Sequence, residues 1–211
     1  MNKIVPDQKK GGHTGAKTSL QLRNREQALE LFELAKQRLH NINSWQSLCG
    51  KGSAEFKLTD KNGNLLRSTK PRIGNLIRIK LNAPENQEGD GYDWVRIEAF
   101  KHTKDHLKDE EQYGFRVRPV QNPFDNKERS AHFYTSDATS TFLVKRNVNL
   151  VSAMELGRNE IPNNNPQPFL NKIRNVIIAI AAMMGMAHPQ WKNLVTGILK
   201  GKKETNLKKS N

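Results

Sequence analysis

The sequence predicts an α+β fold, in which a curled antiparallel sheet or barrel-like meander of seven to eight strands has an N-terminal helix and a long apolar C-terminal helix packed on it. Three observations support this class. Apolar residues recur at helical spacing early in the chain, alternate with polar residues through the middle, and form an uncharged run near the end. A chain of 211 residues has the length of one domain with short polar ends.

The first helix is predicted from Arg25 to Asn41. The side chain of Asn24 can accept a hydrogen bond from the first turn, and Gln27 follows three residues later, as in a capping box. Apolar residues then step by three or four along one face, which is typical of a helix that lies on a sheet. This face comprises Leu29, Phe32, Ala35, Leu39 and Ile42.

From Ala54 to Gly157 apolar residues alternate with polar ones, which predicts strands with one buried face. Asn62-Gly63 and Asn147–Asn149 favour tight hairpin turns. Residues 101–111 are polar and are predicted as a strand end followed by a loop. No long helical segment separates the strands, so we expect antiparallel pairing. The predicted strands lie at Ala54–Leu58, Leu65–Leu66, Ile77–Leu81, Val95–Phe100, Phe115–Arg118, around Phe133, Thr141–Lys145 and Leu150–Leu156.

A long apolar helix is predicted from Phe169 to Ala187, with a short last helix that ends at Gly201. The uncharged run Val176–Ala187 would rise about 18 Å as a helix, well short of the ~30 Å hydrocarbon core, so it predicts a buried helix and no membrane span. A curled sheet around such a helix resembles the helix-grip ligand binders in general form. In that family two helices follow the first strand, whereas the segment from Phe56 to Ile77 predicts a hairpin, so no family is assigned.

Basic residues are concentrated at the two ends of the chain. The net charge is +14, and residues 1–25 hold six basic residues and one acidic residue, while residues 200–211 hold five basic residues and one acidic residue. Few apolar residues accompany these charges, so residues 1–23 and 201–211 are predicted to be disordered basic tails around a single domain at 24–200. Such tails attract polyanions.

Cys49 is the single cysteine, so no disulfide can form within the chain. The residues that follow Met1 lack the apolar run of a signal peptide. We therefore expect a cytoplasmic protein.

Arg158 and Glu160 follow the last predicted strand and form the first candidate site. At the mouth of the sheet Arg158 could pair with an anion and Glu160 could orient it. The alternative is that both residues cap loops or the helix that follows.

The second candidate site is the outer face of the sheet. Arg96, Arg116 and Arg118 share the alternation phase opposite to the apolar residues, so neighbouring strands would create a basic surface that could bind phosphates. Trp94 and Tyr134 could stack bases there, with Phe100 beside them. The alternative is a solvated face whose basic residues pair with carboxylates across strands. These carboxylates belong to Glu55, Glu98 and Glu155.

Other chemistry-bearing residues do not form a recognisable motif. His102 and His106 are four residues apart, but the position after the first histidine is Thr103, where a zinc hydrolase has glutamate. Cys49 could be a nucleophile only with a base nearby, and burial as a small apolar side chain is the simpler interpretation. We therefore assign no metal, cofactor or catalytic residue.

Three functions remain open. The leading hypothesis is a non-enzymatic binding or interaction protein whose basic tails dock on an acidic partner, of which nucleic acid is the most obvious. The first alternative is a binding protein for an apolar small molecule, held between the sheet and the helix at Phe169–Ala187. The second alternative is an enzyme with a site around Arg158, Glu160 and the strand that contains Trp94. Such an enzyme would require titratable groups that converge in one cleft.

Overall fold

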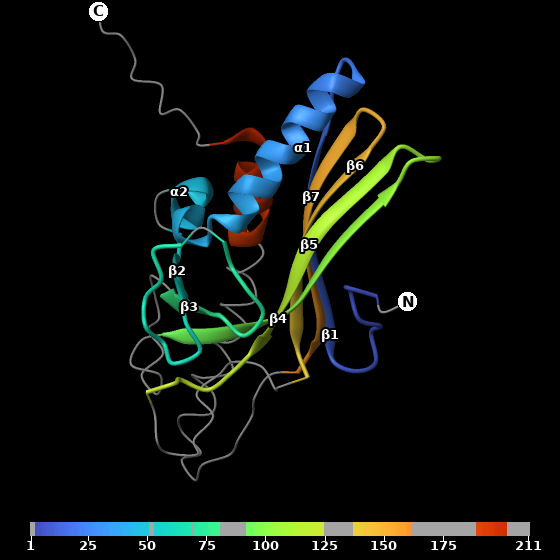
Figure 1. The fold of residues 1–211 in the computed structure, drawn as a ribbon. Helices are drawn as coiled ribbons and strands as arrows, with labels where there is room; N and C mark the ends of the chain where they lie inside the picture. The colour runs from blue at the N-terminus through green and yellow to red at the C-terminus, as the bar shows by residue number, and fades with distance from the viewer. Residues whose placement is uncertain are drawn as a thin grey trace, which may run out of the picture.

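The computed structural model describes residues 3–50, 53–68, 70–80, 92–124, 137–161 and 189–201. Within these residues seven antiparallel strands form one curled sheet that does not close, and helices pack on its concave side (Figure 1). The predicted α+β class is therefore confirmed. The helix predicted at Phe169–Ala187, the strand around Phe133 and the tail at 202–211 lie outside the described residues.

The strands follow the order β1-β7-β6-β5-β4-β3-β2 across the sheet. From β2 to β7 each strand pairs with the next one in sequence, and β1 then pairs with β7. The short connections favour this meander, because only an antiparallel partner can be reached through a tight turn. The strands are β1 (Gly12–Gln21), β2 (Glu55–Thr59), β3 (Leu76–Lys80), β4 (Asp93–Asp105), β5 (Glu110–Pro119), β6 (Thr139–Asn147) and β7 (Leu150–Glu160).

Strand β1 corrects the prediction of a disordered leader at residues 1–23. It pairs with β7 from Gly12 opposite Glu160 to Gln21 opposite Leu150. The hydrogen bonds of β1 come from a strand more than a hundred residues away, so the local composition did not predict them. Among the inner side chains of β1, only Leu20 is large and apolar, and Thr14, Ala16 and Thr18 are small.

Helix α1 (Arg25–His40) begins where it was predicted. The Asn24 side chain accepts a hydrogen bond from the Gln27 backbone N–H at 2.9 Å. The buried residues of α1 are Ala28, Phe32, Ala35 and Leu39, which match most of the predicted stripe and face strands β5 to β7.

Two short helices that the sequence pattern did not predict follow α1. They are η1 (Ile42–Ser44) and α2 (Trp45–Cys49), each too short to show a helical repeat. The predicted hairpin after β2 is reduced to one bridge between Thr59 and Leu65, and the sheet partner of β2 is β3. Once β1 is included, helices do follow the first strand, so the hairpin argument against a helix-grip arrangement was wrong.

The β4–β5 hairpin extends through most of the predicted polar loop at residues 101–111. Its polar residues pair across the strands, as His102 does with Glu111 at 2.7 Å. A β-bulge between Ile97 and Ala99 reverses the alternation in β4, so Phe100 points inward and packs on Phe115. The prediction that Phe100 lies on the outer face was therefore wrong.

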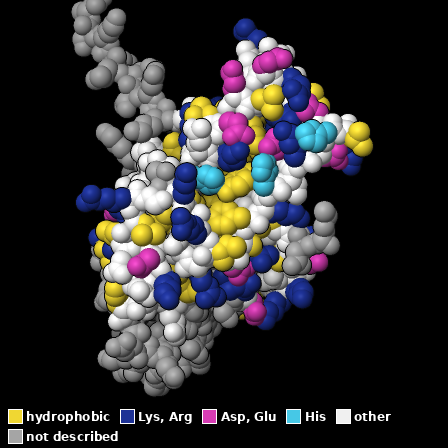
Figure 2. Space-filling view, in the orientation of Figure 1, with side chains coloured by type: hydrophobic (Ala, Val, Ile, Leu, Met, Phe, Trp, Pro, Cys, Tyr) yellow, Lys and Arg dark blue, Asp and Glu magenta, His cyan; other side chains and the backbone are white. Residues whose placement is uncertain are grey.

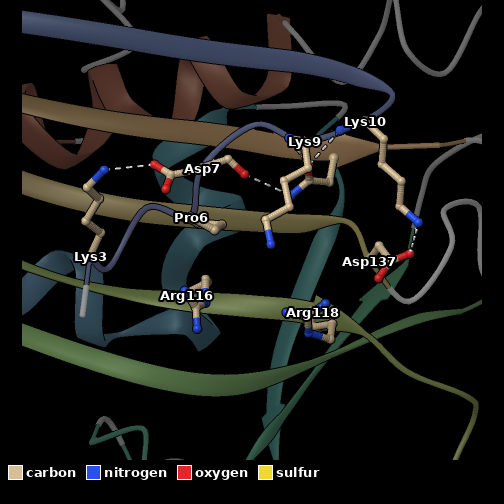
Figure 3. Close-up of a pocket in the computed structure, with 9 residues that line it drawn as sticks. Lys3, Pro6, Asp7, Lys9, Lys10, Arg116, Arg118 and Asp137 are labelled. Carbon is tan, nitrogen blue, oxygen red and sulfur yellow. Dashed lines mark hydrogen bonds and ion pairs between the residues drawn. The ribbon is translucent and has the colours of Figure 1, made fainter. Parts of the chain in front are cut away.

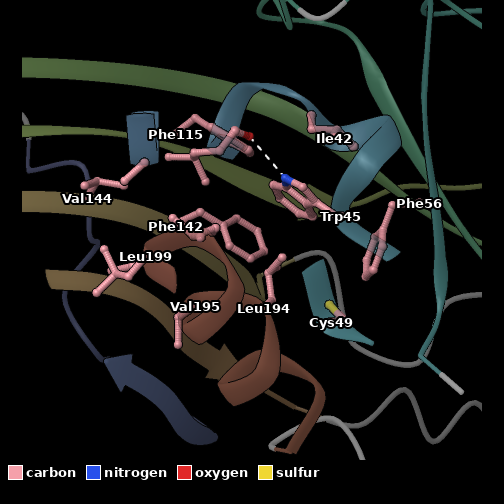
Figure 4. Close-up of a cluster of buried hydrophobic side chains, with 14 of the residues drawn as sticks. Ile42, Trp45, Cys49, Phe56, Phe115, Phe142, Val144, Leu194, Val195 and Leu199 are labelled. Carbon is pink, nitrogen blue, oxygen red and sulfur yellow. Dashed lines mark hydrogen bonds between the residues drawn. The ribbon is translucent and has the colours of Figure 1, made fainter. Parts of the chain in front are cut away.

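The core lies between the sheet and the helices. Trp45, which is 1% exposed, lies at its centre and contacts Phe56, Phe115 and Phe142 (Figure 4). Residues 189–200 are helical and are called the final helical segment below. This segment adds Leu194, Val195, Ile198 and Leu199 to the core. This side of the sheet is called the inner face below, and the opposite side is the outer face.

The final helical segment is held by α1 and α2. Arg38 Nη1 donates hydrogen bonds to the carbonyl oxygens of Ile198 and Leu199, both at 2.9 Å. Gly197 packs so tightly that a Cβ atom there would overlap the Leu48 carbonyl oxygen. Gly201, with a φ of 79°, ends the helix as predicted. Within the described ranges, no helix has the length and apolar character needed to cross a membrane.

Part of the inner face reaches the surface between α1 and the β4–β5 hairpin. Apolar side chains form a patch there, with histidines beside it (Figure 2). Tyr113 and Phe100 are half-buried, and the rings of His40 and His102 lie 4.9 and 5.7 Å from the Tyr113 ring. The open curl therefore leaves aromatic surface of the inner side accessible to solvent.

Candidate functional site: a buried carboxyl pair on the inner face

The most unusual group on the inner face is the carboxyl group of Glu155 in β7. Its cross-strand neighbours are Ala16 and Phe142, which both belong to the hydrophobic core. Glu155 is 1% exposed, and neither carboxyl oxygen has a hydrogen-bond partner of good geometry in the described structure. Buried carboxyl groups are normally paired, so this group calls for an explanation.

A second carboxyl group, that of Glu160, is brought to the same face by a β-bulge. Simple alternation would place residues 155 and 160 on opposite faces of β7. Between Gly157 and Glu160, however, β7 has one residue more than β1, and Asn159 adopts a left-handed φ of 55°. This places the Glu160 side chain on the same face of β7 as Glu155.

Gly157 leaves the space that the Glu160 carboxyl group occupies. A Cβ at this position would overlap both Glu160 Oε1 and Thr14 Oγ1. The Thr14 hydroxyl donates a hydrogen bond to Glu160 Oε1 at 2.9 Å, while Glu160 Oε2 has no partner among the described residues.

Burial and mutual repulsion raise the pKa of both carboxyl groups. Burial raises the pKa of Glu155 from 4.5 to about 8; the proximity of Glu160 adds to the shift, and the Ser140 hydroxyl and Arg158 oppose it. The pKa of Glu160 is also raised, chiefly by burial, although the hydrogen bond from Thr14 acts to lower it. Near neutral pH the Glu155 carboxyl is therefore mostly protonated, and it can donate as well as accept a hydrogen bond.

The Arg158 and Glu160 candidates do lie together at the end of β7. Arg158 Nη1 donates to the carbonyl oxygen of Gly157 at 2.6 Å and has a longer contact of 3.4 Å to that of Thr14, so this atom caps backbone groups. The enzyme hypothesis required titratable groups that converge in one cleft. Glu155 and Glu160 lie close together with raised pKa values, which meets part of that condition, and the enzyme hypothesis stays a prediction. Trp94 lies in β4, away from this group in the sheet order, and is not part of the site.

The outer face carries the predicted arginines in the expected phase. Arg116 and Arg118 both donate hydrogen bonds to the carboxylate of Glu98. The distance from Arg118 Nε to Glu98 Oε2 is 2.7 Å. Arg96 is exposed on the same strand as Glu98. The cross-strand pairing proposed as the alternative is thus correct for Glu98.

Base stacking on this face is not supported by the positions of the aromatic residues. Trp94 is 2% exposed and packs edge-on against Phe124 at 5.8 Å, so its ring has no free face for a base. Tyr134 lies outside the described residues. Docking of the basic ends on an acidic partner stays a prediction, because residues 3–10 are folded against the sheet and residues 202–211 are not described.

His102 pairs with Glu111 across the β4–β5 hairpin, and Cys49 packs in the core. Among the described residues, no group of three or more histidine, cysteine or acidic residues could hold a metal ion. Cys49 is buried, and burial raises the pKa of its thiol to about 12, which suits a packing role.

Comparison with known proteins adds only weak likenesses. No protein-family model and no curated protein matches the sequence. Among solved structures, Ara h 8.0201 is 9% identical, with 89% of this chain and 99% of that chain covered and a TM-score of 0.37. Protein Ms6760 from Mycobacterium smegmatis is 10% identical (88% and 90% covered, TM-score 0.37), and norcoclaurine synthase from Thalictrum flavum is 9% identical (91% and 96% covered, TM-score 0.33). Likenesses at this level support no inference about a ligand.

Proposed function

We propose that this protein binds a small, mainly apolar molecule on the inner face of the sheet, with the Glu155 carboxyl group as the polar anchor. The observation that carries this proposal is the burial of Glu155 with neither carboxyl oxygen in a hydrogen bond of good geometry, although the Ser140 hydroxyl lies close enough to affect its pKa. An unmade hydrogen bond of a buried polar group costs about 1–3 kcal/mol. A ligand that supplies the missing partner would recover that free energy on binding.

The chemistry of the site defines the class of ligand. A protonated carboxyl group is neutral and matches a neutral partner, such as a carbonyl or hydroxyl group, and would not favour an anion beside Glu160. The surroundings of the carboxyl group are aromatic: the buried Phe142, next to Glu155, contacts the partly buried Trp191 at 5.5 Å, and Trp191 contacts the buried Phe56 at 6.0 Å. An aromatic environment of this kind suits a ring-containing apolar body with one polar group.

Nile red, which is neutral, apolar and carries a carbonyl acceptor, provides a direct test. We expect saturable binding with increased Nile red fluorescence, and we expect the Kd to rise about 2- to 10-fold in Glu155→Leu, the value of one hydrogen bond. Binding to the wild type should also weaken as the pH rises from 6 to 9, because ionisation removes the donor and leaves a charge beside the ligand.

Two variants make this test specific. Glu155→Gln keeps a neutral donor and acceptor, so its affinity should change little with pH. Glu110→Gln removes a half-buried carboxylate at the start of β5, where it pairs with Lys145 at 3.0 Å, and should behave as the wild type. Equal affinity and equal pH dependence in the wild type and both Glu155 variants would show that Nile red does not contact this carboxyl group.

A further inference from the structure

A second concave site lies on the outer face, where residues 3–10 cross the sheet. These residues and strand β5 enclose a groove of about 500 Å³ (Figure 3). Its lining is rich in cations and contains no aromatic side chain among the described residues. The lining residues are Lys3, Pro6, Asp7, Lys9, Lys10, Arg116, Arg118, Asp137 and Asn159.

The N-terminal wall of this groove is held by specific contacts. The Asn159 side chain accepts hydrogen bonds from the backbone N–H groups of Lys9 and Lys10 at 2.8 and 3.2 Å. Gln8 Nε2 donates to the carbonyl oxygens of residues 10, 11 and 12. Arg116 Nη1 donates to the carbonyl oxygen of Ile4, which is itself buried. The left-handed bulge at Asn159 therefore shapes both the inner carboxyl pair and this outer wall.

The charges of the groove are only partly compensated. Five basic side chains line the groove together with two acidic ones, which form exposed ion pairs: Lys3 with Asp7 at 2.9 Å and Lys10 with Asp137 at 2.6 Å. The Glu98 carboxylate also binds both Arg116 and Arg118, so this group of side chains keeps a net charge of +2. Exposed pairs of this kind contribute little free energy and exchange readily with another anion. Lys9 Nζ and Arg116 Nη2 have no hydrogen-bond or ion-pair partner within the described residues.

We infer that this groove binds a small anion that carries phosphoryl groups. Several lysine ammonium groups around an arginine pair provide the multiple point charges and N–H donors that phosphoryl oxygens accept. The volume fits a small molecule. The lack of aromatic lining and the burial of Trp94 disfavour a stretch of stacked bases, so nucleic acid is the competing outcome of the test.

Calorimetric titration of the full chain with inorganic pyrophosphate tests this inference. Lys9→Glu should weaken pyrophosphate binding at least about tenfold, since it replaces a charge-assisted contact by repulsion. Lys200→Glu makes the same charge change at the exposed end of the final helical segment, and should leave the affinity within about twofold. Asp137→Asn releases Lys10 without removing a cation, and should strengthen binding severalfold.

The outcomes separate a shaped site from general charge. Loss in Lys9→Glu, with gain in Asp137→Asn and no change in Lys200→Glu, would support the groove. Equal losses in both lysine variants would overturn it, and so would no pyrophosphate binding by the wild type. Binding of a single-stranded oligonucleotide without pyrophosphate binding would also overturn it. None of these results depends on the inner carboxyl pair.

Discussion

Replacing Glu155 with glutamine is expected to remove a large part of the pH dependence of folding stability between pH 4.5 and 8. The pKa of Glu155 is raised from 4.5 to about 8 by folding, so the folded state retains a proton that the unfolded state releases. The stabilisation from this proton is fully present below pH 4.5 and is lost as the pH rises to about 8. With about 1.4 kcal/mol per pKa unit, the loss is on the order of 4 kcal/mol.

Urea unfolding at pH 5, 6.5 and 8 would measure this effect. The free energy of unfolding of the wild type should fall relative to that of Glu155→Gln as the pH rises, because glutamine cannot ionise. Glu110→Gln should follow the wild type, since Glu110 is near the surface and paired with Lys145. Parallel curves for the wild type and Glu155→Gln would mean that Glu155 ionises in the folded protein as easily as in the unfolded chain.

Replacing Trp45 with alanine is expected to lower the free energy of unfolding by about 3–5 kcal/mol, the usual range for removing a large buried aromatic side chain. Trp45 packs among three phenylalanine rings at centroid distances of 4.9 to 6.1 Å. Its Nε1 also donates hydrogen bonds to the carbonyl oxygens of Leu39 and Arg38 at 3.2 and 3.3 Å, near the end of α1. The substitution leaves a cavity and removes this cap.

Trp191→Ala is the matched comparison, measured by urea unfolding at the same pH. Trp191 is only partly buried and contacts the same aromatic cluster from the final helical segment through Phe56 and Phe142. Its loss should cost less than half as much stability, but it should weaken Nile red binding. If the two tryptophan variants were equally stable, Trp45 could not be the centre of the core.

Elements defined by local patterns could be predicted from the sequence. Helix α1 has both a capping residue, Asn24, and an apolar stripe, so its start and buried face were predicted correctly. The strands after Ala54 were recognised by alternation, and short connections indicated antiparallel pairing. Strand β1 could not be recognised, because its stabilising hydrogen bonds come from β7 and all its inner residues except Leu20 are small.

The site was missed because alternation was misleading in β7. Leu150, Met154 and Leu156 are apolar, so they suggested that the even-numbered residues face the core and that Glu155 faces solvent. The structure places Val151 and Ala153 in the core, and Glu155 therefore shares the inner face. Two bulges, one in β4 and one in β7, also move the side chains that follow them to the other face of the sheet. A bulge is hard to predict from sequence, because its main signal is a residue such as Asn159 that tolerates a left-handed backbone.

A ¹³C NMR titration of the Glu155 side-chain carboxyl carbon, assigned with Glu155→Gln and repeated with Nile red bound, would show whether this carboxyl group is protonated and contacts the ligand. We expect a pKa near 8 in the free protein and a higher pKa with Nile red bound, because the neutral ligand favours the protonated form. A carboxyl group that titrates near 4.5, unchanged by Nile red, would show that Glu155 is neither protonated at neutral pH nor in contact with the ligand.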